Sequence, residues 1–253
     1  MADVGIVIGA GGEIGGACAL ALAPSHRTVL CVDRDADAAE DTAANIREAG
    51  RSAITLIVDA EESGFAAAVT HAAAELGETN TAVHAIAFEE HISAKAISVE
   101  SIQRSFTLGP LAAFSLFREL LLGGGLARGA GFTVIGSLHA SHAFTNALGY
   151  NLAQAALTQL VATLAHEWVA DGVRVNAVIP GWTRTRGETA LYGEDFLNAT
   201  ASLLPMGRFG AASEIAAAVE YLASSRAAYI SGTSITVDGA LGVSLAQLPG
   251  GQG

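Results

Sequence analysis

Residues 5–16 read GIVIGAGGEIGG: an apolar run, a cluster of glycines, and then the start of an alanine-rich segment. The apolar run over 5–9 predicts a β-strand, and the segment over 14–23 predicts a helix. Glycines at such a turn let the backbone approach a pyrophosphate, which the N-terminus of the helix then stabilises. Glycine is also common wherever a helix packs closely on a strand, so the turn alone is weak evidence. Its position after the first strand favours a dinucleotide-binding fold.

The same alternation of short apolar runs and alanine-rich segments continues along the chain. Strands are predicted over 5–9, 28–32, 53–58, 82–88, 131–137, 173–179 and 234–238. Helices are predicted over 14–23, 36–49, 63–76, 98–122, 150–170 and 212–225. The apolar runs are continuous rather than alternating, which is typical of parallel strands covered on both faces. The sequence therefore predicts an α/β fold, a single doubly wound, Rossmann-like parallel sheet with helices on both faces.

No linker, repeat or change of composition divides the 253 residues, which predicts a single dinucleotide-binding and catalytic domain over 1–253. Two segments are expected to be irregular. Residues 183–203 are polar and follow a Pro-Gly pair, which favours a mobile flap over a site. The tail, about 245–253, is expected to be loose.

The composition, 51% hydrophobic and 15% charged, excludes a disordered chain. A net charge of −12, with 13 basic residues and Lys95 as the single lysine, argues against nucleic acid and anionic membrane as partners. No secretory signal and no membrane span are expected, because no basic residue precedes the first apolar run and no run of 18 apolar residues occurs. Cys18 and Cys31 lie in no metal-binding motif and are expected to be buried thiols of a cytoplasmic protein.

An acid ends the second predicted strand. Asp33 lies 18 residues after Gly15, where a carboxylate can accept hydrogen bonds from both ribose hydroxyls of NAD. The same carboxylate would repel the 2′-phosphate of NADP, whereas the neighbouring Arg34 would attract it. NAD is therefore favoured as the cofactor, and NADP stays possible. The alternative is that Asp33 only caps the helix that follows.

Motifs in the second half of the chain carry a family resemblance. Ser137 ends the fifth predicted strand, and Tyr150 follows 13 residues later. VRVNAVIPGWTRT comes at 173–185, followed by PMGRFGAASEIAAAVEYLAS at 205–224 and YISGTSITVDGA at 229–240. In these stretches the chain resembles the short-chain dehydrogenase/reductase family, and the resemblance extends over essentially the full length up to about residue 240.

The first half resembles the family less closely. The family's Thr-Gly-x-x-x-Gly-x-Gly turn is matched by Ile8, Gly9 and Gly15, but Glu13 stands at the middle glycine. The Glu13 side chain is expected to point outward from the helix start, where the helix dipole favours a carboxylate. Asp59, after the third predicted strand, matches the family's acid that meets the adenine.

The end of the fourth predicted strand matches the family's Asn-Asn-Ala-Gly only loosely, as residues 84–87. The stretch VHAIAF also resembles the enoyl-carrier-protein reductase branch. The longer tyrosine-to-lysine spacing of that branch, however, would fall on Leu157.

The resemblance implies a catalytic set of Ser137, Tyr150 and Gln154, in which the serine holds a substrate carbonyl and the tyrosine passes a proton. It also implies a cofactor-binding set. That set is Gly9, Gly12, Ile14, Gly15, Asp33, Arg34, Asp59, Ala60, Ala85, Tyr150, Gln154, Pro180, Gly181, Thr183 and Thr185. The last four of these are expected at the nicotinamide.

Gln154 stands where the family has a lysine that binds the ribose and acidifies the tyrosine. A glutamine can still donate to the ribose, but it supplies no charge. A cation at ~4 Å in an effective dielectric of about 20 is worth about 4 kcal/mol at most, so its loss removes roughly two to three units of acidification. Oxidation, which needs the phenolate, is expected to suffer more than reduction. The family's relay asparagine is also missing, because Phe106 and Thr107 occupy that region.

Four histidines fall around the expected site: His84, His91, His139 and His142. Histidine titrates near ~6.5, so any of them could replace the missing relay, although each alone is more often a loop or second-layer residue. His142 is the preferred candidate. Glu89, Glu90 and His91 are too closely adjacent for a defined metal site, and no metal is predicted.

The leading hypothesis is an NAD(P)-dependent oxidoreductase that interconverts an alcohol and a ketone or aldehyde by hydride transfer, with a small-molecule substrate. The alternatives are a non-redox lyase, dehydratase or isomerase on the same fold, and a catalytically impaired dinucleotide-binding protein. Family members usually pair the helices at 98–122 and 150–170 with those of another subunit. A homotetramer or homodimer is therefore expected.

Overall fold

The computed structural model describes residues 2–185, 187, 189 and 193–245. Its centre is a seven-stranded sheet in the order β3-β2-β1-β4-β5-β6-β7, and every neighbouring pair of strands is parallel. The strands are β1 Ala2–Ile8, β2 His26–Asp33, β3 Ala53–Ile57, β4 Thr79–His84, β5 Leu126–Ile135, β6 Arg174–Pro180 and β7 Ser234–Val237. The predicted α/β fold with one doubly wound parallel sheet is confirmed.

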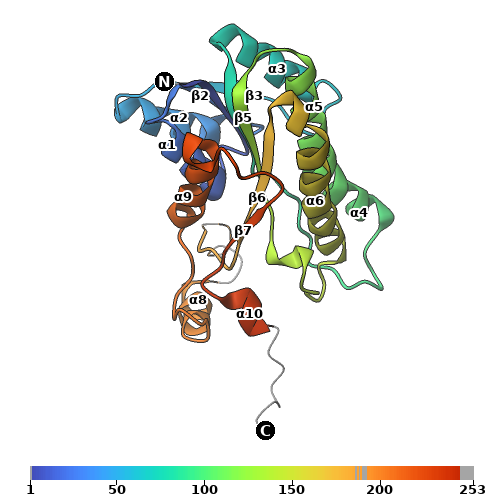
Figure 1. The fold of residues 1–253 in the computed structure, drawn as a ribbon. Coiled ribbons are helices and arrows are strands. Elements are labelled where there is room, and N and C mark those ends of the chain that lie inside the picture. Colours follow the sequence, from blue (N-terminus) through green and yellow to red (C-terminus); the bar gives the residue numbers. More distant parts are fainter. Residues whose placement is uncertain (1, 186, 188, 190–192, 246–253) are drawn as a thin grey trace.

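Helices cover both faces of the sheet, with α1, α2 and α9 on one side and α3, α5 and α6 on the other (Figure 1). Their bounds are α1 Glu13–Leu22, α2 Ala36–Glu48, α3 Phe65–Leu76, α4 Val99–Phe106, α5 Ala112–Leu122, α6 Leu148–Glu167, α8 Glu194–Ala201, α9 Ala212–Ala223 and α10 Leu241–Leu245. Shorter turns lie at Leu138–Ala140, Val169–Asp171 and Ser225–Ala227.

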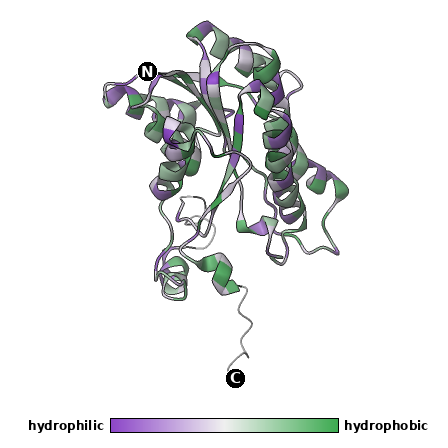
Figure 2. Cartoon of the chain, in the orientation of Figure 1, coloured by the Kyte–Doolittle hydropathy of each residue, from purple (hydrophilic) through white to green (hydrophobic). Residues whose placement is uncertain are grey.

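Two hydrophobic clusters hold the layers together. Neighbouring residues of one strand serve different clusters, since Ile6 packs with α3, α5 and α6 whereas Val7 packs with α1, α2 and α9. Strand β6 is buried at all seven positions, which is why its sequence shows no alternation. Figure 2 shows hydrophobic residues in the strands and in the helices on both sides.

The turn between β1 and α1 is one of the tightest contacts in the fold. Gly9 has a positive φ of 83°, and a Cβ atom on Gly15 would lie 2.0 Å from the carbonyl oxygen of Gly9. The same oxygen accepts a hydrogen bond of 3.0 Å from the Gly12 amide. The glycines of this turn therefore permit an approach that a side chain would block.

The predicted helix over 98–122 is in fact three elements. Helix α4 is followed by a π-helical turn, Thr107–Leu111, and then by α5. Pro110 has no amide hydrogen to donate, and Gly109 leaves helical geometry with ψ −105°, which together explain the break. By length and hydropathy Val99–Leu122 would suffice to cross a membrane, but half of its most apolar window is buried, as in a core helix.

Two other predicted boundaries are wrong. The fourth strand ends at His84, and no regular strand continues to residue 88. Helix α8 lies within 183–203, so that segment is not irregular throughout. Residues 186, 188 and 190–192 of the predicted flap, and 246–253 of the predicted tail, lie outside the described residues.

We expect Gly15→Ala to lower the free energy of unfolding by about 2 kcal/mol or more, because its methyl group would meet the Gly9 carbonyl. Helix propensity alone would give the opposite sign. Urea unfolding followed by circular dichroism measures the effect. Gly64→Ala is the matched control, since nothing lies within 4 Å of a Cβ atom there. Equal stability of the two variants would contradict the packing argument.

Candidate active site

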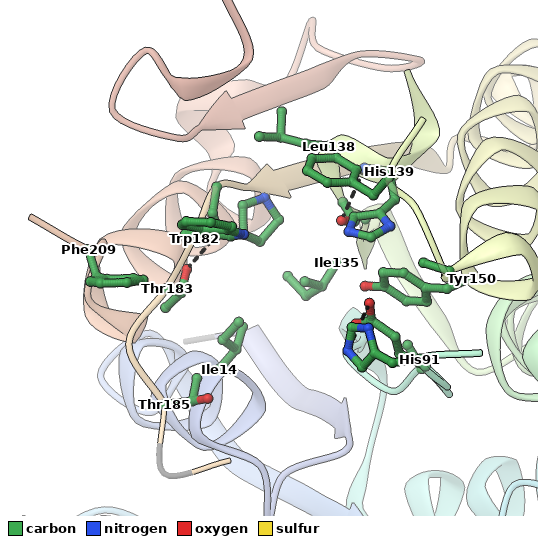
Figure 3. A pocket seen from close by; sticks show the side chains of 18 of the residues that line it. Ile14, His91, Ile135, Leu138, His139, Tyr150, Trp182, Thr183, Thr185 and Phe209 are labelled. Carbon is green, nitrogen blue, oxygen red and sulfur yellow. Dashed lines mark hydrogen bonds and ion pairs between the residues drawn. The ribbon is translucent and has the colours of Figure 1, made fainter. Parts of the chain in front are cut away.

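A cavity of about 450 Å³ opens at the carboxyl ends of β4, β5 and β6, beside the start of α6 (Figure 3). It brings together eight residues of the predicted site. These are Ile14, Ala85, Ser137, Tyr150, Pro180, Gly181, Thr183 and Thr185. Ligands of doubly wound sheets bind at this edge, so the cavity lies where the fold expects one.

A second, smaller cavity of about 110 Å³ lies beyond the ends of β1, β2 and β3. It is lined by five more predicted residues: Gly9, Asp33, Arg34, Asp59 and Ala60. The two cavities share Ile86 and Ala87 in their walls, so they adjoin each other. Together they form a track along the carboxyl edge of the sheet, from the acids after β2 and β3 to the hydroxyls of Ser137 and Tyr150.

Three predicted residues line neither cavity. Gly15 is packed against Gly9, and Gly12 is the exposed residue before the first turn of α1. Gln154 is only 2% exposed and lies one turn after Tyr150 on α6. The structure gives its Oε1 atom no hydrogen-bond partner.

Asp33 faces the smaller cavity and already holds two backbone groups. Its carboxylate accepts hydrogen bonds from the amides of Gly11, at 2.9 Å, and Asp35, at 3.1 Å. The helix that follows is capped by Asp35, whose side chain accepts from Ala38. The alternative role for Asp33, as the cap of that helix, is therefore wrong. The Arg34 guanidinium lies 3.7 Å from the carboxylate of Asp59.

Ser137 follows a glycine that lets β5 and β6 end close together, since a Cβ atom on Gly136 would lie 2.5 Å from Ile179. The Ser137 hydroxyl oxygen accepts a hydrogen bond from the His139 amide at 3.3 Å. The Ser137 side chain also forms a hydrogen bond with Tyr150, and both side chains line the cavity.

The environment of Tyr150 makes its phenol a weaker acid than a free tyrosine. Burial raises the pKa of Tyr150 to about 12, and the negative charge of Glu89 acts in the same direction. Hydrogen bonds with Ser137 and Gln154 lower this pKa, but they are outweighed. Among the described residues that line the cavity, none is a lysine or an arginine. The phenol is consequently protonated throughout the neutral pH range.

Glu89 and His91 belong to the loop after β4, which a short parallel bridge between Ile92 and Ala147 ties to the start of α6. Both side chains line the main cavity, and the His91 Nε2 atom lies 3.6 Å from the Glu89 carboxylate. Over the described ranges, no three histidine, cysteine or acidic side chains are arranged to hold a metal ion.

The histidines separate into different roles. His84 is completely buried in the core, where its Nε2 atom contacts the Leu108 carbonyl oxygen at 2.9 Å and burial lowers its pKa to about 4. His84 therefore does not line the cavity, in keeping with the second-layer alternative. His142 does not line the cavity, and its ring contacts Ser141 and the Leu138 carbonyl oxygen instead.

His139 is the histidine that lies beside the tyrosine. Its ring stacks on Phe144 at 4.1 Å and meets the Tyr150 ring edge-on at 4.8 Å (Figure 3). Its Nδ1 atom lies 2.6 Å from Oδ1 of Asn151, and burial lowers its pKa. The sequence offered no sign of this arrangement beyond the position of His139 two residues after Ser137.

The remaining cavity wall is largely apolar and aromatic. Trp182 and Phe209 stack at 6.0 Å where the chain leaves β6, and a bridge between Thr183 and Gly210 fixes that segment. Phe196, on α8, also lines the cavity. Phe209 was not recognised from the sequence as a site residue.

Comparisons with known proteins agree with this geometry. A family model described as enoyl-(acyl carrier protein) reductase matches residues 9–242. The cis-4-hydroxycyclohexanecarboxylate dehydrogenase of Sinomonas cyclohexanicum is 31% identical, over 93% of this chain and 95% of the relative. The galactitol 2-dehydrogenase (L-tagatose-forming) of Cereibacter sphaeroides is 32% identical, over 92% of each chain.

Among solved structures, the Pseudomonas aeruginosa RhlG/NADP active-site complex superimposes with a TM-score of 0.85 at 26% identity, covering 95% of this chain and 96% of RhlG. The family match covers every strand after β1 and, apart from Ile8, all residues that line the two cavities. The chain therefore belongs to the short-chain dehydrogenase/reductase family.

Proposed function

We propose that this protein is an NAD(P)-dependent oxidoreductase that interconverts an alcohol and a ketone or aldehyde. One observation carries the proposal: the Ser137 and Tyr150 hydroxyls line a cavity that adjoins a second cavity formed at the ends of β1, β2 and β3. The first has the polar groups that bind a carbonyl, and the second has the acids that bind an adenosine ribose. The dehydrogenases among the relatives support the same reaction class.

The residues present fit a dinucleotide. The glycine turn brings the backbone of β1 to the start of α1 without a side chain in between, and Gly12 leaves that helix start exposed. Asp33 and Asp59 line the adenosine end, and Pro180, Gly181, Thr183 and Thr185 line the other end. Gln154 lies one turn after Tyr150 on α6, beneath the cavity wall, and its enclosed Oε1 atom has no protein partner, so it would have a free acceptor for a nicotinamide ribose hydroxyl once the side chain turns toward the cavity.

The protein residues then have separate tasks. Ser137 donates a hydrogen bond to the substrate oxygen, and Tyr150 gives a proton to that oxygen in reduction or removes it in oxidation. When bound, the nicotinamide supplies or accepts the hydride. The apolar wall around Trp182 and Phe209 excludes water from the reacting carbon.

Gln154 stands in for the family's lysine and biases the chemistry. Its amide is neutral, so it leaves the Tyr150 phenol protonated, in keeping with a pKa raised to about 12. A protonated phenol is the form that reduction uses. We therefore propose a protein that acts mainly as a reductase at neutral pH.

We propose that NAD(H) is preferred over NADP(H). Asp33 lines the adenosine cavity with a negative charge, and the nearby Arg34 points toward Asp59. A 2′-phosphate would meet the first carboxylate and compete with the second for the guanidinium.

We also propose a homodimer or homotetramer. Leu111, Leu122 and Leu152, along the π-helical turn, α5 and α6, are between 45% and 64% exposed. Sedimentation at micromolar concentration is expected to show the oligomer, and a monomer alone would contradict it.

Tyr150→Phe is expected to lower kcat/KM for ketone reduction by about 100-fold or more, because the proton donor is lost.

In the wild type, the rate of alcohol oxidation is expected to rise about tenfold per pH unit up to at least pH 10, because the phenolate fraction grows toward a pKa of about 12. Reduction is expected to stay flat below that range. Initial rates across pH test both directions.

Gln154→Lys is expected to move the oxidation profile to lower pH by roughly two to three units, because a cation stabilises the phenolate. Gln159→Lys is the matched control, being the same change at an exposed position of the same helix. Identical pH profiles for both variants would contradict the charge argument.

Asp33→Asn is expected to tighten NADPH binding at least about tenfold relative to NADH, which corresponds to about 1.4 kcal/mol. Asp35→Asn, at the exposed cap of α2, is expected to leave the ratio unchanged. Fluorescence titration with each reduced cofactor measures both dissociation constants. Equal affinities for NADH and NADPH in the wild type would argue against the assigned preference.

A further inference from the structure

We propose that Nε2 of His139 accepts a hydrogen bond from a second hydroxyl of the substrate, so that the site selects α-hydroxy ketones and vicinal diols. The inference rests on the proposed oxidoreductase function and adds the substrate class to it. Its basis is a chain of hydrogen bonds that assigns the donor and acceptor atoms of the His139 ring.

The orientation of the Asn151 amide starts the chain. Its Nδ2 atom donates to the Phe144 carbonyl oxygen at 2.9 Å, which identifies the nitrogen side of the amide. The Oδ1 atom therefore faces the His139 ring, where Nδ1 lies 2.6 Å away. An amide oxygen only accepts, so Nδ1 carries the hydrogen. In the neutral ring Nε2 is then a bare acceptor.

The ring is held in place on two sides. Phe144 stacks on it with an angle of 16° between the planes, and Tyr150 meets its edge at 69°. These contacts leave the ring little freedom to rotate. Figure 3 shows His139 beside Tyr150 at the cavity, so the acceptor lies next to the proposed proton donor.

Nothing in the described part of the protein satisfies this acceptor. Nε2 of His139 has no hydrogen-bond partner there. It is also not among the fully buried side-chain atoms that lack a partner, so it is accessible from the cavity. Because His139 lines the main cavity, its free lone pair is open to that space. Burial lowers the pKa of His139 below its usual value and outweighs the hydrogen bond with Asn151, which acts in the opposite direction, so the neutral ring is favoured.

An unpaired hydrogen-bond acceptor beside apolar side chains in the cavity wall lets the site discriminate between substrates. Phe144 stacks on the ring and Leu138 lines the same cavity, so a substrate that packs there without offering a donor leaves the nitrogen unpaired. Sites built to bond a hydroxyl discriminate strongly against analogues that lack it. Because the His139 ring contacts the Tyr150 ring, we expect its acceptor to bind a hydroxyl on the carbon next to the reacting one.

The test compares two matched pairs of ligands. For turnover, kcat/KM is measured with 2-hydroxycyclohexanone and with cyclohexanone at saturating NADH. We expect a ratio of about 10 to 100 in favour of the hydroxy ketone. His139→Phe keeps a flat ring against Phe144 but removes the acceptor, and we expect it to bring this ratio close to one. His142→Phe, outside the cavity, is the matched control and is expected to keep the wild-type ratio.

Equilibrium binding separates this inference from the proposed function. Calorimetry with NADH-bound protein compares trans-1,2-cyclohexanediol and cyclohexanol, and we expect the diol to bind about 10-fold more tightly or better. Imidazole ¹⁵N shifts are expected to show His139 protonated at Nδ1, with Nε2 shifting when the diol binds. Absence of NADH-linked turnover of both ketones would count against the proposed function alone. Equal affinity for diol and alcohol, an unchanged ratio in His139→Phe, or a proton on Nε2 would overturn the inference.

Discussion

The contact between Gly15 and the carbonyl of Gly9 is the constraint on which the site depends. It sets how closely α1 starts beside the end of β1, because no atom fits between them. The same short turn reaches both cavities, with Gly9 in the wall of the smaller and Ile14 in the wall of the larger. A shift of this turn would therefore alter the walls of both cavities. The glycines therefore serve two purposes: they let the turn form part of both cavity walls, and they let a phosphate approach the backbone.

Charge around Tyr150 decides in which direction the chemistry is easy. Burial and the Glu89 carboxylate both oppose the phenolate, and the amide of Gln154 compensates only through a hydrogen bond. A raised pKa does not hinder reduction, because the neutral phenol is the form that donates the proton. A lysine at position 154 would make the phenol a better base, but the phenol would be a protonated donor over a narrower pH range. Under the proposed mechanism, glutamine at position 154 therefore changes the favoured direction of the reaction and keeps the acid itself.

Much of the fold could be predicted because continuous apolar runs mark strands that are covered on both faces. The spacing of Ser137 and Tyr150 also predicted that they would meet, and they do line one cavity. What the sequence could not supply was side-chain direction. His84 was counted among four histidines around the expected site, yet its side chain is completely buried in the core. Pro110 lies inside the helix predicted over 98–122, but the break there, and the π-helical turn that forms it, were not predicted.

The choice between His139 and His142 shows why a histidine cannot be assigned from position alone. Both follow the same strand, three residues apart, and only one meets an amide whose orientation is fixed. That amide belongs to Asn151, the residue directly after Tyr150 on α6. One helix therefore delivers the phenol and also sets the hydrogen on the neighbouring imidazole. Because successive residues of a helix are separated by about 100°, a slip of one residue along α6 would remove both groups together. The position of α6 against the end of β5 therefore fixes both the Tyr150 phenol and the acceptor Nε2 of His139.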